Sequence, residues 1–480
     1  MILPFDNSYA RLPERLFERT EPAKVPNPNL IRLNRELAVK LSLDPDWLES
    51  DEGIAMLAGN SIPQGADPLA QAYAGHQFGG FVPQLGDGRA ILLGEIHGVD
   101  GVPRDIQLKG SGRTRFSRNG DGKSALGPVL REYLVSEAMH ALGIPTTRAL
   151  AAVSTGETVE REMRLPGGVF TRIAASHLRI GTFQCFQARN DIAAVRLLAD
   201  YAIARHYPEA VGADNPYLSF LEAVITTQSK LIARWMSVGF IHGVMNTDNT
   251  AISGETIDFG PCAFMEAFHP GCVFSSIDRN SRYAWGNQPA IAQWNLARFA
   301  ESILSLLDAN GSEAKKVAEK ALVAFPGQVQ RHLTNTFRAK LGLMNDEDSF
   351  ITETFKTLED QKVDFTLFFR HLTLVAAGDN PEALAALFTD RSGFESWLTK
   401  WKNLADPDNC LADMRANNPI LIPRNHRVEQ AIQKAYSGDF APFHRLVDAL
   451  AHPYVEQPDY ADFEIPPRPE EVVHHTFCGT

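Results

Sequence analysis

The chain has 480 residues, of which 44% are hydrophobic and 22% are charged, and this composition is typical of a globular protein with a large core. Its formal charge of −12 excludes a general nucleic-acid or anionic-membrane surface, because binding to a phosphate backbone requires a concentrated basic patch. No apolar run reaches the roughly 20 residues of a spanning helix, and the N-terminus lacks a signal-peptide pattern. We therefore expect a cytoplasmic monomer that contacts neither nucleic acid nor membrane.

The first predicted elements are strands. Between about residues 85 and 110, the segments RAILLGEI and RDIQLK flank the turn HGVDGVP, as in a small antiparallel sheet. Pro128 then opens a helix that Gly143 closes. Glu132 and Ser136 lie off the apolar stripe of this helix, so Glu132 is free to face another group.

The later predicted elements are helices. The segment FLEAVITTQSKLIARWMSVGF keeps the helical period until Gly239 and leads directly into IHGVMNTDN. Beyond residue 285, helical patterns recur in WNLARFAESILSLL, in residues 313–340, in PEALAALF and in VEQAIQKAY. No repeat and no Gly/Ser linker divides the chain into independent units.

This order, a sheet with one helix followed by many helices, predicts an α+β class and a bilobal protein-kinase-like fold. We expect residues 1–60 to form an N-terminal extension that packs on the core. Residues 61–175 would form the small β-rich N-lobe with the nucleotide-binding loops. Residues 176–480 would form a helical C-lobe with the metal and catalytic motifs and the C-terminal tail.

The segment HGVMNTDNTAISGETIDFG, residues 242–260, aligns with the kinase signature HRDLxxxN followed by DFG. The kinase aspartate that accepts the proton of the substrate hydroxyl falls on Val244, which cannot accept a proton. Asn249 and Asp258 keep the two oxygen ligands that suit a divalent metal on nucleotide phosphates. We expect the intervening TAISGETI to form a short hairpin, and the alternative is that His242 is a core histidine and Asp258 part of an ordinary turn.

A kinase-like N-lobe requires a strand lysine and a helix glutamate that pairs with it. Lys109 and Glu132 fit these roles, with Glu137 as the competing glutamate. Gly86 and Gly88 precede them in QLGDGRAILL, with Arg89 alongside, where missing side chains let backbone N–H groups approach an anion.

A cationic glycine-rich loop, GSGRTRFSRNGDGKSALG, follows Lys109 directly. One interpretation is a solvated surface loop, which is common for charged glycine-rich segments. The other is a polyphosphate clamp, which Arg172 and Arg179 in FTRIAASHLRIG would extend. Such a clamp could hold a nucleotide in an orientation different from that in a kinase.

At this point the chain resembles the selenoprotein O family nearly end to end. The resemblance is carried by YAGHQFGGFVPQLGDGRAILLGE, QLKGSGRTRFSRNGDGKSALGPVLREYLVSEAMHALGIPTTRAL, FTRIAASHLRIGTFQ, HGVMNTDNTAISGETIDFGPCAFM, NNPILIPRNH and the terminal PPRPEEVVHHTFCGT. It implies a kinase-like fold that binds ATP in a flipped pose and transfers AMP to hydroxyl groups of proteins, with Mg²⁺ or Mn²⁺ as cofactor. UTP is an alternative donor, since no residue visibly selects the base.

The resemblance also implies roles for individual residues. Asp248 would be the proton acceptor or, as the alternative, a carboxylate that lies near the metal without binding it directly. Asn249 and Asp258 would hold the metal. Glu132 would form the structural ion pair. Nucleotide contacts would come from Gly86, Gly88, Arg89, Lys109, Asp121, Gly122, Arg172, Arg179 and Asp258.

Five cysteines without CxxC spacing indicate neither a disulfide framework nor a zinc site. In animal relatives selenocysteine lies near the C-terminus, and Cys478 occupies the corresponding place. Cys478 is either a free thiol on a frayed tail or the partner of Cys272 in a redox switch.

Two other classes of function stay open beside protein adenylylation. A phosphotransferase of the aminoglycoside or lipid-kinase type has the motif HGD, which Val244 contradicts at the decisive position. A non-catalytic nucleotide-binding scaffold would tolerate the missing aspartate, but it has little need for the retained lysine, asparagine and arginines.

Overall fold

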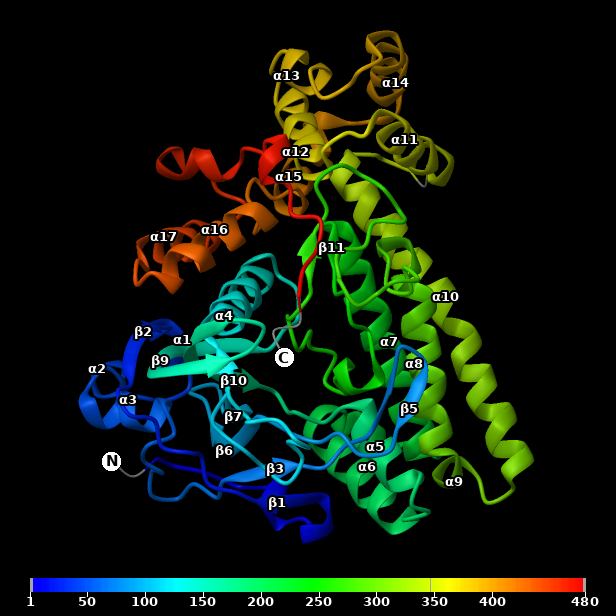
Figure 1. Ribbon diagram of the computed structural model, residues 1–480. Coiled ribbons are helices and arrows are strands. Elements are labelled where there is room, and N and C mark those ends of the chain that lie inside the picture. The colour runs from blue at the N-terminus through cyan, green and yellow to red at the C-terminus, as the bar shows by residue number, and fades with distance from the viewer. Residues whose placement is uncertain (1–2, 346, 478–480) are drawn as a thin grey trace.

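The computed structural model describes residues 3–345 and 347–477 and is a mixed α/β structure built on one large antiparallel sheet (Figure 1). The strands lie in the order β1-β3-β6-β7-β10-β9-β2, and β8 pairs with β10. Their bounds are β1 Phe17–Arg19, β2 Asn29–Leu33, β3 Leu69–Gln71, β6 Ala90–His97, β7 Pro103–Lys109, β8 Ser124–Ala125, β9 Arg148–Glu160 and β10 Arg164–Ala174. The two edge strands, β1 and β2, come from the first sixty residues.

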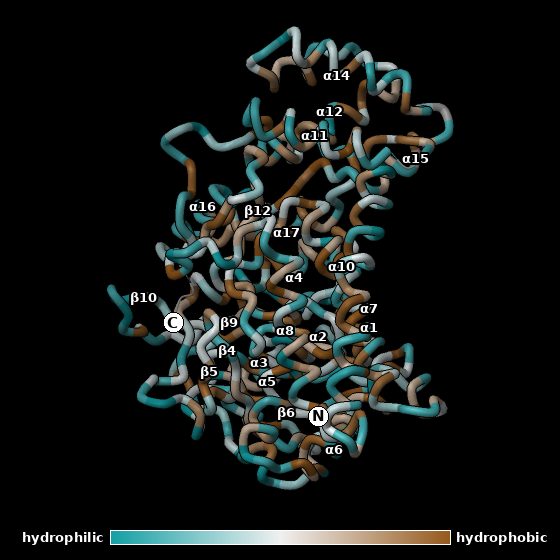
Figure 2. Tube along the Cα trace, turned by 90° about the vertical axis from the view of Figure 1, so that its right-hand side faces the viewer, coloured by the Kyte–Doolittle hydropathy of each residue, from teal (hydrophilic) through white to brown (hydrophobic). Residues whose placement is uncertain are grey.

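Helices cover both faces of the sheet. Apolar side chains of α1 Arg35–Lys40, α2 Pro45–Leu48 and α3 Asp51–Leu57 form one hydrophobic cluster with the sheet residues Ile106, Leu108 and Val169. The helix α4 Leu126–Ala141 packs on the opposite face, against β9 and β10. Figure 2 shows hydrophilic residues on the projecting loops and hydrophobic residues where the elements meet.

The alternation of side chains along β7 decides which residues reach the α4 side. Successive side chains of a strand point to opposite faces, so Ile106 and Leu108 enter the cluster with α1–α3, and Gln107 and Lys109 point the other way. Arg172 pairs with Gln107 across the β7–β10 ladder and therefore faces the same side. The sheet thereby presents one polar row beneath α4.

The rest of the chain is mainly helical. Its helices are α5 Ile180–Gln187, α6 Ile192–His206, α7 Pro216–Ser237, α8 Gln288–Ser302, α9 Leu304–Leu307, α10 Gly311–Leu341, α11 Asp348–Gln361, α12 Phe365–Ala376, α13 Glu382–Ala385, α14 Arg391–Leu404, α15 Pro407–Asn417, α16 Asn425–Tyr436 and α17 Ala441–Leu450. Two short antiparallel strand pairs accompany them, β4 Gly75–Gln77 with β5 Gly80–Val82 and β11 Phe240–Ile241 with β12 Ala263–Phe264. The helices α16 and α17 return to pack on α4 (Figure 1).

The predicted strands between residues 85 and 110 and the predicted helices are confirmed as β6, β7, α4, α7, α8 with α9, α10, α13 and α16. The hairpin predicted for residues 250–257 is wrong. Ala251 bridges to Arg179, whereas Thr256 bridges to Thr146, so the two arms pair with different segments and not with each other. Glu132, which lies off the apolar stripe of α4, faces Lys109 as expected, and Ser136 is fully buried.

Along the described residues, no helix combines the length and apolarity needed to cross a membrane.

Candidate active site

A cleft of about 760 Å³ lies where the polar side of the sheet and α4 meet the segment after β11. Every residue predicted for nucleotide, metal, ion-pair or proton-acceptor roles lines it. These residues are Gly86, Gly88, Arg89, Lys109, Asp121, Gly122, Glu132, Arg172, Arg179, Asp248, Asn249 and Asp258. They come from elements that are as much as about 170 positions apart in the sequence, so the fold alone brings them together.

Lys109, at the end of β7, lies between two carboxylates. Its Nζ atom is 2.6 Å from Oε2 of Glu132 on α4 and 2.5 Å from Oδ1 of Asp258. The competing Glu137 is engaged elsewhere, because its carboxylate accepts hydrogen bonds from Arg148 at 2.7 and 2.9 Å. The lysine–glutamate pair expected from the sequence is therefore Lys109 with Glu132.

Two buried arginines also converge on Asp258. Arg172 NH1 lies 2.8 Å from Oδ1 of Asp258, and Arg179 NH1 lies 2.7 Å from its Oδ2. Burial opposes ionisation of Asp258, but Lys109 and the two arginines outweigh it and hold the pKa of this carboxyl well below its usual range. With Glu132 included, Lys109 and the two arginines form one ion-pair cluster with two carboxylates, and this cluster is the cationic centre of the cleft.

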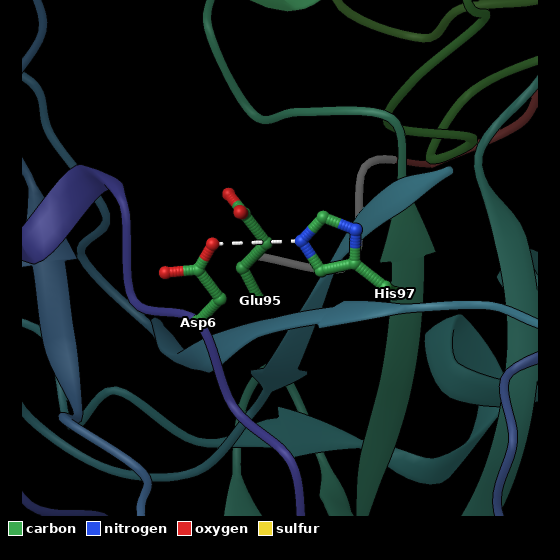
Figure 3. A group of neighbouring side chains, drawn as sticks. All are labelled: Asp6, Glu95 and His97. Atoms are coloured by element: carbon green, nitrogen blue, oxygen red, sulfur yellow. Dashed lines mark ion pairs between the residues drawn. The ribbon is translucent and has the colours of Figure 1, made fainter. Parts of the chain in front are cut away.

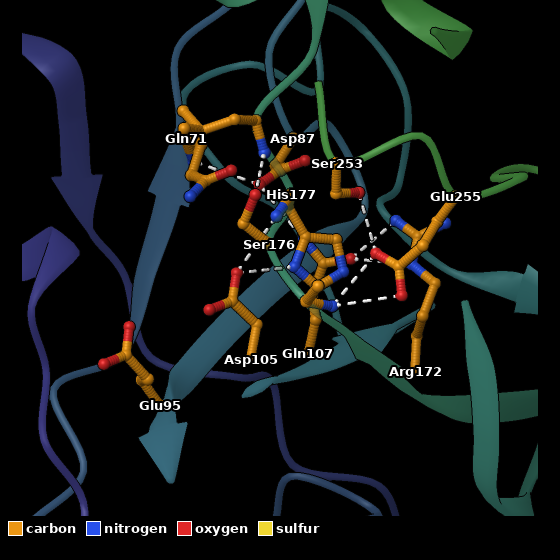
Figure 4. Close-up of polar contacts among 12 residues, drawn as sticks. Gln71, Asp87, Glu95, Asp105, Gln107, Arg172, Ser176, His177, Ser253 and Glu255 are labelled. Atoms are coloured by element: carbon orange, nitrogen blue, oxygen red, sulfur yellow. Dashed lines mark hydrogen bonds and ion pairs between the residues drawn. The ribbon is translucent and has the colours of Figure 1, made fainter. Parts of the chain in front are cut away.

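Arg172 is held in place by a fixed amide. Gln107 Oε1 accepts hydrogen bonds from Arg172 at 2.6 and 3.2 Å, and Gln107 Nε2 donates to Asp87 at 3.2 Å (Figure 4). Asp87 stands between Gly86 and Gly88, so this chain of contacts connects the glycine segment to the cationic centre. Gln107 and Asp87 were not predicted from the sequence, although the period of two along β7 places Gln107 on the same face as Lys109.

Asp248 and Asn249 belong to a single turn of 3₁₀ helix, Thr247–Asn249. Asp248 Oδ2 accepts a hydrogen bond from Gln77 Nε2 at 3.1 Å, and Oδ1 is buried without a hydrogen-bond partner among the described residues. Burial raises the pKa of the Asp248 carboxyl to about 6. Asn249 donates through Nδ2 to the carbonyl of Val244 at 2.9 Å, which fixes the orientation of its amide.

The kinase position of the proton acceptor holds no acceptor here. Val244 lines the cleft with a hydrocarbon side chain. His242, two residues earlier, is a core residue whose Nε2 contacts the carbonyl of Ile257 at 2.9 Å and whose ring stacks on Trp235. His242 thus ties the turn to the segment before Asp258 and takes no part in the cleft.

The glycine segment before β6 is packed too tightly for side chains. Gly86 has φ +77°, and a Cβ built on it would lie 2.3 Å from the ring of Phe116. A Cβ on Gly88 would lie 2.9 Å from the carbonyl oxygen of Phe116. Glycine is therefore required at both positions for the segment to line the cleft together with the loop that carries Phe116.

The cationic loop after Lys109 divides in the structure. Arg118 and Lys123 line the cleft, and Lys123 is also paired with Glu157 at 2.8 Å, whereas the exposed Arg113 and Arg115 do not line it. Asp121 in the same loop accepts two hydrogen bonds from Arg161, at 2.9 and 3.1 Å. The cleft therefore contains two of the four basic residues of the predicted clamp, Arg118 and Lys123.

A buried polar layer supports the cleft from below (Figure 4). Asp105 on β7 contacts the His177 ring at 2.9 Å and Arg205 at 2.8 Å. Glu255 accepts a hydrogen bond from the backbone of Ala175 at 3.0 Å, and burial raises the pKa of its carboxyl to about 7. These contacts anchor the segment that leads from β10 to Arg179.

One further group has side chains of the types that bind metals, Asp6, Glu95 and His97 (Figure 3). Glu95 already pairs with Arg205, and Asp6 pairs with Arg11. His97 is exposed, and acidic groups at the surface are common without an ion, so the group is not assigned as a metal site.

Of the two cysteines of the expected redox switch, Cys272 is partly buried, and burial raises the pKa of its thiol to about 11. Cys478 lies outside the described residues. The described tail lies along the segment that follows Cys272, since Thr476 pairs with Ser275, three residues after Cys272, and donates through Oγ1 to the carbonyl of Pro261 at 2.6 Å.

Comparison with known proteins places these residues in a family context. Residues 1–451 match the family described as protein adenylyltransferase SelO. The chain is 56% identical to the protein nucleotidyltransferase YdiU of Nitrobacter hamburgensis, over 99% of this chain and 96% of that protein. It is 57% identical to the protein of the same name from Rhodopseudomonas palustris strain BisB5 and 56% identical to that of Methylorubrum populi, in each case over at least 99% of both chains.

Proposed function

The chain belongs to the SelO family of protein adenylyltransferases, and on this basis we propose that it transfers AMP from ATP to Ser, Thr or Tyr hydroxyls of proteins and releases pyrophosphate. UTP is the alternative donor of a nucleotidyl group, because no residue of the sequence visibly selects the base. The relatives are named protein nucleotidyltransferases, and we assign this activity to the cleft.

The single observation that carries the proposal is the position of the candidate proton acceptor in the cleft. A kinase needs an acceptor at the position of Val244, whereas the side chain there is hydrocarbon. Asp248 lies four residues further on, buried in the wall of the same cleft. If Asp248 deprotonates the attacking hydroxyl, the phosphorus under attack would lie in a different place from the γ-phosphorus in a kinase. This difference favours attack at the α-phosphorus.

The same arrangement supports the bilobal kinase-like interpretation of the fold. Lys109 on the sheet and Glu132 on α4 form the pair of a kinase N-lobe, and Asn249 and Asp258 follow in the helical part. We propose the lobe limits 61–175 and 176–480, with residues 1–60 as an extension that adds β1 and β2 to the sheet. Asp121 and Gly122 would contact the nucleotide from the loop above.

The residues present fit a divalent metal. Asn249 and Asp258 offer hard oxygen ligands, and the unpartnered Oδ1 of Asp248 is a buried oxygen in the same wall. We propose that Asn249 and Asp258 hold Mg²⁺ or Mn²⁺. The metal, when bound, neutralises charge on the phosphates.

The protein's own residues would divide the work in the transfer. The acceptor hydroxyl oxygen forms a bond to the α-phosphorus, the bond from that phosphorus to the bridging oxygen breaks, and pyrophosphate leaves. Lys109, Arg172 and Arg179 provide fixed positive charge for the departing oxygens. Asp248 takes the hydroxyl proton, late in a loose transfer in which positioning and charge neutralisation contribute most.

The test compares ATP labelled at the α- or the γ-phosphate, with Mg²⁺ or Mn²⁺, against the protein itself and a cell lysate, with Asp258→Ala as control. Label from the α-position alone supports the proposal, and UTP labelled at the α-position tests the alternative donor. Label from the γ-position would replace the proposal with a phosphotransferase. Nucleotide binding with neither label would indicate a scaffold.

We also propose that Cys272 and Cys478 form a regulatory disulfide. The pairing of Ser275 with Thr476 supports it, because sequence neighbours of the two cysteines lie side by side. Activity with and without reductant should differ in the wild type and not in Cys272→Ser. Equal responses of the two proteins would contradict the switch.

A further inference from the structure

The β4–β5 hairpin lies against the turn that carries Asp248, although the two are about 170 positions apart. Two consecutive hairpin residues donate to this turn: the backbone N–H of His76 to Thr247 Oγ1 at 2.7 Å, and Gln77 Nε2 to Asp248 Oδ2 at 3.1 Å. The hairpin therefore contacts the turn through both its backbone and a side chain.

The hairpin is itself held in a defined conformation. Phe78 has φ +51°, which is uncommon for a side chain of this size, and its N–H donates to Asn246 Oδ1 at 3.2 Å. Tyr283 donates to the same oxygen at 2.6 Å. Since Asn246 directly precedes the turn, the hairpin and the turn form one hydrogen-bonded unit.

The close approach of the hairpin depends on a glycine. A Cβ on Gly75 would lie 2.4 Å from Asp248 Oδ1, so the backbone of β4 packs directly on this oxygen. Oδ1 has no hydrogen-bond partner among the described residues, and the Gln77 amide is the side-chain donor that reaches the other oxygen. The orientation of the carboxylate consequently depends on Gln77.

We propose that Gln77 is a positioning residue that holds the Asp248 carboxylate in its working orientation, an inference that rests on the proposed function of Asp248 as proton acceptor. Gln77 acts through its amide N–H and not by filling space. Gln77 thus contributes to the transfer, although it takes no part in the kinase-like signature.

The test separates hydrogen bonding from packing with Gln77→Met, which keeps the length of the side chain without its donor, and Gln77→Ala. Both variants should lower the maximal rate of α-label transfer roughly 10- to 100-fold, since a hydrogen bond to a charged group is lost. The half-saturating ATP concentration should stay within about twofold of wild type. Phe81→Ala, on the partner strand, controls for disturbance of the hairpin.

The outcomes distinguish this inference from the proposed function. Normal transfer by Gln77→Met would overturn the positioning role while leaving the proposed function intact, as would a loss that appears only in the half-saturating ATP concentration. In an Asp248→Ala background, Gln77→Met should cause less than about twofold further loss, because a residue acting through Asp248 has nothing left to orient. A wild type that transfers no α-label would overturn the proposed function itself.

Discussion

Lys109 Nζ lies 2.5 Å from Asp258 Oδ1, so the lysine expected to contact phosphate is already bound to the carboxylate expected to hold the metal. Asp258 in turn accepts contacts from Arg172 and Arg179. One carboxylate therefore holds three cations of the cleft and, in the proposed function, would also bind the metal. Its removal affects both functions at once.

We predict that Asp258→Ala lowers transfer about 10³-fold, and that Asp248→Ala lowers it about 10²-fold. The larger effect at Asp258 follows from its double role, whereas proton removal contributes late in a loose transfer. Single-turnover rates of α-label transfer measure both. An Asp248 variant that loses as much as the Asp258 variant would contradict this order.

Nucleotide binding without metal provides the control for these variants. Asp258→Ala leaves Lys109 and the two arginines without their shared carboxylate, so metal-free ATP should bind it more tightly than it binds wild type. Calorimetric titration in the presence of a chelator measures the difference. Weaker binding would indicate that the variant has lost the structure of the cleft.

Gly86→Ala should weaken ATP binding roughly tenfold, because the added Cβ meets the ring of Phe116 at 2.3 Å and displaces the glycine segment. Gly101→Ala is the matched control, since Gly101 has a similar φ of +72° and no atom within 4 Å of the built Cβ. Gly101→Ala therefore has a similar energetic cost of placing alanine at a positive φ, but its Cβ contacts no other atom. Equal losses of affinity in both variants would refute the packing explanation.

Sequence patterns predicted the residues that line the cleft better than the residues that hold them in place. Strands and helices have distinct sequence periods, and Lys109 lies at the end of a strand whereas Glu132 lies off the apolar stripe of a helix. Both residues could therefore be recognised from the sequence. The Gln107 amide follows from the same alternation along β7. No local pattern, however, indicates that Gln77 reaches Asp248, because that contact depends on how two distant segments fold together.

The wrong prediction of a hairpin over residues 250–257 has the same origin. The two ends of residues 250–257 pair with Arg179 and Thr146, which a local hairpin pattern cannot indicate. Partners that are distant in the sequence therefore override the local preference of this segment.

We predict that Arg424→Met lowers the free energy of unfolding by about 3–5 kcal/mol, because it leaves two largely buried carboxylates without their partner. Arg424 is 1% exposed and contacts Glu266 and Asp364, joining the segment after Asp258 to the NNPILIPRNH motif. Urea unfolding measures the loss. Arg391→Met, which removes an exposed ion pair with Glu382, should leave stability nearly unchanged, and equal effects would contradict the role of burial.

Lys340 in α10 provides a test of stability against pH. Its side chain is buried, donates to the carbonyl of Asn417 at 2.9 Å and lies 4.3 Å from the ring centre of Phe369. Burial lowers the pKa of its ammonium group from 10.5 to about 7. The folded state therefore binds fewer protons than the unfolded state between these two values.

It follows that the cost of burying Lys340 is fully present below pH 7 and is relieved as the pH rises toward 10.5. Lys340→Met removes this titration, so the stability of the variant relative to wild type should fall by about 3 kcal/mol between pH 7 and pH 9.5. Thermal or urea unfolding of both proteins at the two pH values measures the change, and Lys315→Met gives the baseline for an exposed lysine of the same helix. A stability difference that stays constant with pH would show that Lys340 keeps its proton in the folded protein.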